Sequence, residues 1–101
     1  MMYLLHGQLT AKPGHQEELT DILLEVSKLV SVVKGCKLYA IGKSEVDQNS
    51  VCVTELWENK EDHENSLKVE GVKELIVKAM SIVEGQPTMY QELKIVGGSG
   101  L

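Results

Sequence analysis

The chain has 101 residues, of which 43% are hydrophobic and 25% charged, a length and composition typical of one folded domain and not of a disordered or fibrous protein. Its 10 Lys and Arg residues against 15 Asp and Glu residues give a net charge of −5, which argues against a nucleic-acid partner. No run approaches the ~20 apolar residues of a membrane span, and no cationic leader opens the sequence, so we expect a cytoplasmic protein without a membrane partner.

The first half of the chain predicts a strand, a helix and a hairpin. Residues 2–11 alternate between apolar and polar side chains, which is typical of a strand. Apolar residues then recur at helical spacing from Leu19 to Val33, and Gly35 is expected to close that helix. Segments 36–43 and 51–57 form the predicted hairpin. Pairing Ser44 with Ser50 places Cys36 opposite Glu58, far from Cys52, so both thiols are expected to be reduced.

The second half predicts two helices and a last strand. Asn59 is expected to begin a short helix over about 60–67. A second helical stripe follows Gly71, with Gly85 as its closing residue. Pro87 precedes an extended run from Thr88 to Val96. We therefore expect a single domain over residues 1–96 and a flexible C-terminal tail over residues 97–101.

The order βαββαβ predicts an α+β, ferredoxin-like fold, in which an antiparallel sheet carries both helical segments on one face. The other face mixes Tyr, Ile, Met and Leu with charged residues and has no helix layer to cover it. We therefore expect a homodimer in which two sheets pack face to face about a two-fold axis. His6, on the polar side of the first strand, is expected in that interface.

Four motifs together resemble the antibiotic biosynthesis monooxygenase family. They are Gly7-Gln8-Leu9-Thr10-Ala11-Lys12-Pro13-Gly14, Glu17-Glu18-Leu19, Gly35-Cys36-Lys37-Leu38-Tyr39 and Glu55-Leu56-Trp57. Their order and spacing match the family over about residues 3–95. The resemblance implies a dimeric α+β barrel, and a cofactor-independent monooxygenase that oxidises a quinol- or anthrone-like aromatic with dioxygen.

The resemblance also implies site residues. The family's Glu-x-Trp matches Glu55 and Trp57, with Trp57 expected to line a cavity and to be catalytic beside His63, which replaces a tyrosine of some oxygenases. Ser66 stands where the family often has histidine, and Val53 where some oxygenases have asparagine. Val53, Glu55 and Ser66 are the expected substrate-binding residues.

Trp57, His63 and Glu55 also have purely structural explanations. Trp57 is equally well explained as a core residue, and His63 as a solvated helix residue. A buried Glu55 needs a partner, for which Lys37, Lys43 or a residue of a second subunit are candidates.

No cofactor or metal is expected. In the family's haem-degrading branch, an asparagine, a tryptophan and a histidine ligand would fall on Gly7, Ser66 and Ile76, which cannot replace them. Histidine and cysteine spacings typical of zinc sites are lacking, as are glycine-rich phosphate loops. Because Val53 and Ser66 depart from the oxygenase pattern, a non-catalytic small-molecule-binding or stress-response module is the alternative function.

Overall fold

The computed structural model describes residues 2–101. Within this range the chain forms four strands and three helices. In chain order they are β1 Met2–Thr10, α1 Gln16–Val30, β2 Cys36–Lys43, β3 Ser50–Trp57, α2 Lys60–Ser66, α3 Val72–Met80 and β4 Thr88–Ile95. None of the described helices is both long and apolar enough to cross a membrane.

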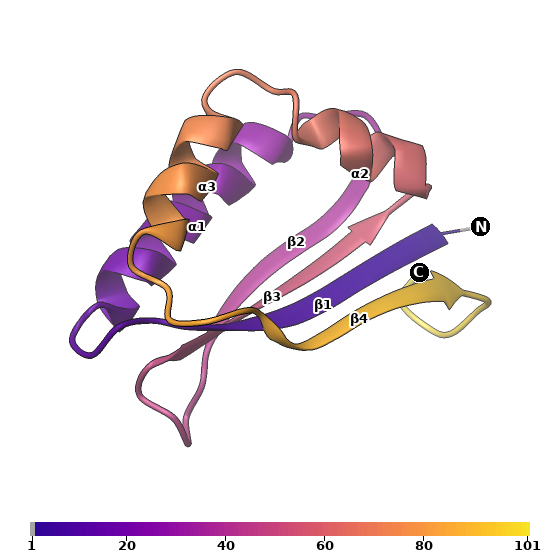
Figure 1. The fold of residues 1–101 in the computed structure, drawn as a ribbon. Coiled ribbons are helices and arrows are strands. Elements are labelled where there is room, and N and C mark those ends of the chain that lie inside the picture. The colour runs from indigo at the N-terminus through magenta and orange to yellow at the C-terminus, as the bar shows by residue number, and fades with distance from the viewer. Residues whose placement is uncertain (1) are drawn as a thin grey trace.

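The strands form one antiparallel sheet in the order β2-β3-β1-β4. All three helices lie on the same side of this sheet, with α1 and α3 packed against each other and α2 over one end (Figure 1). This arrangement confirms the predicted ferredoxin-like α+β fold. β1 and β3 are the two inner strands, so side chains on them are held by neighbours on both sides.

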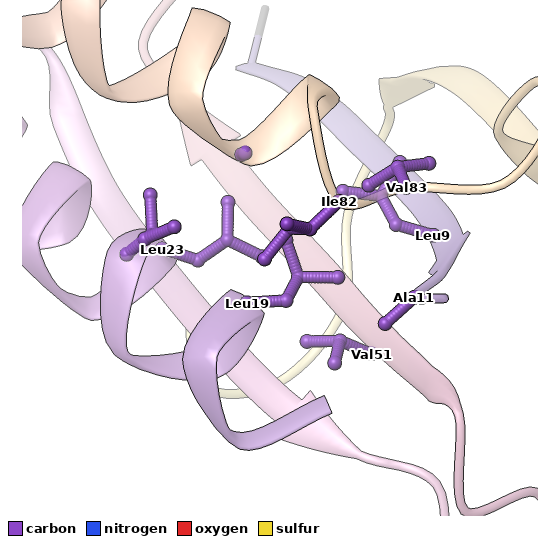
Figure 2. Close-up of a cluster of buried hydrophobic side chains, with 9 residues drawn as sticks. Leu9, Ala11, Leu19, Leu23, Val51, Ile82 and Val83 are labelled. Atoms are coloured by element: carbon purple, nitrogen blue, oxygen red, sulfur yellow. The ribbon is translucent and has the colours of Figure 1, made fainter. Parts of the chain in front are cut away.

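Alternation along the strands separates a covered face from an uncovered face. Leu5 and Leu9 on β1 and Val51 and Trp57 on β3 point toward the helices and are 8% exposed or less. Leu9 and Val51 pack with apolar residues of α1 and of the segment after α3, as Figure 2 shows for Leu19, Ile82 and Val83. This cluster anchors the helix layer to the two inner strands.

The uncovered face carries a row of four leucines at one end. Leu38, Leu56, Leu4 and Leu93 are successive cross-strand partners over β2, β3, β1 and β4. Leu38 and Leu93 are 46% and 45% exposed. The next row includes His6, whose Nδ1 lies 2.9 Å from the Thr54 hydroxyl. The helix-free face is therefore apolar at one end and polar beyond it.

Three sequence predictions need correction. α1 ends at Val30 with Ser31 as its C-cap, and α3 ends at Met80, so Gly35 and Gly85 lie in the turns after these helices and do not close them. Both glycines still have positive φ, 86° and 68°. Cys36 pairs with Trp57 instead of Glu58, because the hairpin register shifts by one residue between Cys36 and Leu38. Both cysteines are free.

Candidate functional site

A cavity of about 220 Å³ lies between the covered face of the sheet and the helices. Its walls are mostly apolar and come from every strand and helix of the fold. The lining residues are Leu5, His6, Gly7, Leu9, Leu23, Tyr39, Val53, Glu55, His63, Ile76, Met80, Pro87 and Tyr90. Apolar walls with a few polar groups are the usual composition of small-molecule sites.

Glu55 and His63 are the paired ionisable groups of this cavity. Glu55 projects from the inner strand β3 and His63 from α2, and their side chains are 14% and 17% exposed. Glu55 Oε1 accepts a hydrogen bond from the indole N–H of Trp57 at 3.0 Å. The same oxygen lies 3.7 Å from His63 Nε2. A carboxylate and an imidazole at this separation can exchange a proton after a small movement.

Burial moves the pKa values of these two groups toward each other. Desolvation raises the pKa of Glu55, and the Trp57 hydrogen bond partly opposes that change. Desolvation lowers the pKa of His63, against the opposing effect of nearby Glu64 and Glu92. Closer pKa values reduce the free-energy difference between the two positions of a shared proton, which suits proton transfer between the carboxylate and the imidazole.

The His63 ring is held between two aromatic side chains. Its centroid lies 5.8 Å from that of Trp57, edge-on, and 5.9 Å from that of Tyr3. The Tyr3 hydroxyl donates a hydrogen bond to Glu92 on β4, and Lys60 Nζ lies 3.8 Å from the same carboxylate. These contacts connect α2 to β1 and β4.

The start of α2 also fixes His63. The Asn59 side chain accepts a hydrogen bond from the Asp62 amide at 2.8 Å, which confirms the predicted N-cap. The Asp62 carboxylate is buried against Gly35, where a Cβ would lie 2.1 Å from Oδ2. At the other end, the Ser66 hydroxyl donates to the carbonyl of His63.

The structure brings three of the five predicted site residues to the cavity wall, namely Val53, Glu55 and His63. Trp57 is fully buried and Ser66 is 2% exposed; neither lines the cavity. Trp57 reaches the site through its hydrogen bond to Glu55 and through its edge-on contact with His63.

The lysines proposed as partners for Glu55 lie elsewhere. Lys37 pairs with Glu58 at 3.0 Å, and Lys43 pairs with Glu17 at 2.7 Å. The partners of Glu55 within the chain are instead Trp57 and His63.

The sequence reasoning missed the cavity's helical wall. Leu23, Ile76 and Met80 belong to the amphipathic stripes of α1 and α3, and their spacing does not separate a residue facing a core from one facing a cavity. The contact of Tyr3 with His63 was also missed, because it joins elements distant in sequence. Among residues 2–101, no group of three or more potential ligands is placed to hold a metal ion.

Comparison with known proteins identifies the family. The family model described as antibiotic biosynthesis monooxygenase matches residues 2–78. A solved structure called a "putative antibiotic biosynthesis monooxygenase" from Chloroflexus aurantiacus is 30% identical, with 99% of this chain and 98% of that chain covered and a TM-score of 0.88. One from Deinococcus radiodurans is 20% identical, with 98% and 97% covered and a TM-score of 0.83, which supports the fold alone. No curated protein matches. The chain belongs to the antibiotic biosynthesis monooxygenase family.

Proposed function

We propose that the chain is a cofactor-independent monooxygenase that oxidises a small quinol- or anthrone-like aromatic with dioxygen in the cavity beside Glu55. One observation carries the proposal: the apolar cavity has a carboxylate–imidazole pair in its wall, with 3.7 Å between Glu55 Oε1 and His63 Nε2. Such a pair supplies the proton acceptor that a phenolic substrate needs before it can give an electron to dioxygen.

The size of the cavity favours a ligand of one or two rings. Its volume of about 220 Å³ is above the ~150 Å³ of an engineered cavity that holds benzene and below the roughly 300–1,000 Å³ of typical ligand pockets. A naphthoquinol-sized compound is therefore a better fit than the three fused rings of an anthrone. No Lys or Arg is among the lining residues, so a neutral ligand is favoured over an anionic one.

The reaction balances without a further reductant. A quinol takes up one dioxygen; one oxygen atom enters the ring to give a hydroxyquinone, and the other leaves as water. The quinol supplies the electrons for both events. The protein's part is to remove the hydroxyl proton and to exclude bulk water from the ring.

The test is oxygen uptake by the metal-stripped protein with benzo- and naphthoquinols and with anthrone. We expect catalysed uptake with the smaller compounds, and its loss when Glu55 is replaced by Gln. Glu61, which is exposed on α2 and does not line the cavity, provides the matched control Glu61→Gln. Uptake that never exceeds autoxidation would overturn the proposal. Saturable binding without uptake would instead support the non-catalytic binding module.

We also propose that the protein is a homodimer through its uncovered sheet face. The support is the row of Leu38, Leu56, Leu4 and Leu93, in which Leu38 and Leu93 on the two edge strands are 46% and 45% exposed and Leu56 between them is 8% exposed. Packing two such faces together about a two-fold axis removes that surface from water in both copies. Sedimentation at micromolar concentration measures the mass, and a monomer would contradict the dimer.

A further inference from the structure

We propose that Glu55 is the proton acceptor of this site, that His63 relays the proton, and that the Trp57 indole positions the Glu55 carboxylate toward the cavity. This inference rests on the proposed function in one respect: an aromatic hydroxyl compound must occupy the cavity. It assigns the chemistry to the carboxylate instead of the imidazole, and it makes a hydroxyl donor a requirement for tight binding.

The two carboxylate oxygens of Glu55 differ in their partners. Oε1 accepts the indole N–H of Trp57 and faces His63 Nε2. Oε2 makes no hydrogen bond among the described side chains, and Glu55 lines the cavity. One oxygen is therefore committed to the protein, and the other is free to accept a hydroxyl proton from a ligand.

The orientation of the His63 ring fits a relay role. Its ring is held between Trp57 and Tyr3 at centroid distances of 5.8 and 5.9 Å, and Nε2 lies next to Glu55 Oε1. In this orientation Nε2, the ring nitrogen nearest to Glu55, is placed to receive a proton from the carboxyl group. His63 also belongs to α2, a short helix that lies over one end of the sheet (Figure 1).

No fixed cation neutralises Glu55 within the described part of the chain. The groups whose charged states interact with it are Tyr3 on β1, Cys36 and Tyr39 on β2, and Tyr90 on β4; the pKa of each is raised partly by the negative charge of Glu55. These groups stay neutral at physiological pH, which leaves His63 as the group that can exchange a proton with it. An unneutralised, desolvated carboxylate is a stronger base than an ordinary glutamate.

The step itself is a simple proton transfer. The ligand's O–H bond breaks, its proton forms a bond with Glu55 Oε2, and the electron pair stays on the ligand oxygen as a phenolate. A half-turn of the carboxyl group about the Cγ–Cδ bond then brings the protonated oxygen to His63 Nε2, which takes the proton and restores the carboxylate. Dioxygen, the oxidant of the proposed function, receives the electron from the phenolate.

Binding of 2-naphthol and of its methyl ether, 2-methoxynaphthalene, tests the assignment without turnover. The two compounds differ in the O–H donor, and isothermal titration calorimetry gives both affinities. We expect wild type to bind the naphthol roughly tenfold or more tighter, because a hydrogen bond to a charged acceptor is lost with the ether. In Glu55→Gln the Trp57 N–H holds the amide oxygen, the NH₂ group faces the cavity, and the preference falls to a few-fold or less. Glu61→Gln is expected to keep the wild-type preference.

The outcomes separate this inference from the proposed function. Equal wild-type affinity for both compounds, or a preference that persists in Glu55→Gln, would overturn the role of Glu55 while leaving an aromatic-binding cavity. Failure of both compounds to bind would overturn the inference and the proposed function together.

The pH dependence of kcat/KM for an accepted quinol gives the second readout. We expect the rate to rise with pH as Glu55 ionises, and this rise to disappear in Glu55→Gln with roughly a 100-fold loss or more. Trp57→Phe is expected to move the rise to higher pH, because the indole hydrogen bond lowers the pKa of Glu55. A rise that survives in Glu55→Gln but disappears in His63→Gln would show that His63 is the base.

Discussion

Replacing Gly35 with alanine tests how the turn before β2 holds α2, and with it His63, against the sheet. Gly35 has φ of +86°, and a Cβ there would lie 2.1 Å from Asp62 Oδ2 and 2.6 Å from Asp62 Cγ. The left-handed backbone costs an alanine roughly 1–2 kcal/mol. Displacing the buried Asp62 side chain adds on the order of 1–3 kcal/mol, the range for overpacking. We therefore expect Gly35→Ala to lower the free energy of unfolding by about 2–5 kcal/mol.

The chain offers a matched control for the backbone contribution. Gly14 has nearly the same φ, +85°, but no heavy atom lies within 4 Å of the position that a Cβ would take there. Gly14→Ala should therefore show the conformational cost alone. Urea unfolding at pH 7, with both variants compared at the same slope, gives the two free energies. Their difference measures the contact with Asp62.

A double-mutant cycle completes the test. Asp62 Oδ2 is buried without a hydrogen-bond partner among the described residues, so Asp62→Ala should itself cost little. In the double variant Gly35→Ala/Asp62→Ala the new methyl group no longer meets the Asp62 carboxylate, so the loss of stability should be close to that of Gly14→Ala. The stability recovered in this way is the coupling energy between positions 35 and 62. If Gly35→Ala lies within about 0.5 kcal/mol of Gly14→Ala, or if the cycle shows no coupling, the close packing of Asp62 on Gly35 is refuted.

Three further predictions concern the cavity and the uncovered face. Burial raises the pKa of Glu55 above its ordinary value of 4.5, so above that pH the folded protein binds more protons than the unfolded chain. The free energy of unfolding should therefore fall as the pH rises from 4.5 through the raised pKa of Glu55. Glu55→Gln should lack this decline, and an identical pH dependence in both proteins would contradict the prediction. Leu38→Asp should shift the dimer toward monomer in light scattering, whereas Val46→Asp, at a loop position 98% exposed, should not; equal effects would exclude the leucine face as the interface. His63→Phe should keep the naphthol preference in calorimetry while slowing quinol turnover in oxygen uptake, and loss of the preference would count against a relay role for His63.

The sequence predicted the fold well because the signals for its elements are local. The alternation along β1 and the helical spacing from Leu19 to Val30 each specify one element and its buried side. The ends of the helices were predicted less well, as Gly35 and Gly85 show. Gly35 and Gly85 do adopt positive φ, but the helices end before the turns that contain them, since Ser31 and Ser81 are the C-caps.

The site was predictable only in part, because a cavity is a property of tertiary packing. Residue types and the family resemblance pointed to Glu55 and His63, and β-strand alternation placed Val53 and Glu55 on one face. The sequence left Trp57 open between a core residue and a cavity-lining residue, and the structure buries it completely; nothing in the sequence indicated that its N–H would bind Glu55. The one-residue register shift near Cys36 is likewise decided by the pairing of whole strands. The dimer and the cytoplasmic location stay predictions.

The position of Val53 and Glu55 on β3 has a consequence for how this cavity can change. Val53, Glu55 and Trp57 alternate along an inner strand whose backbone is hydrogen-bonded on both edges. Exchanging the side chain at position 53 or 55 therefore alters the cavity wall while leaving the backbone hydrogen bonds of the sheet intact. Natural mutation, or a designed library restricted to positions 53 and 55, can therefore change the ligand preference of the cavity without changing the fold.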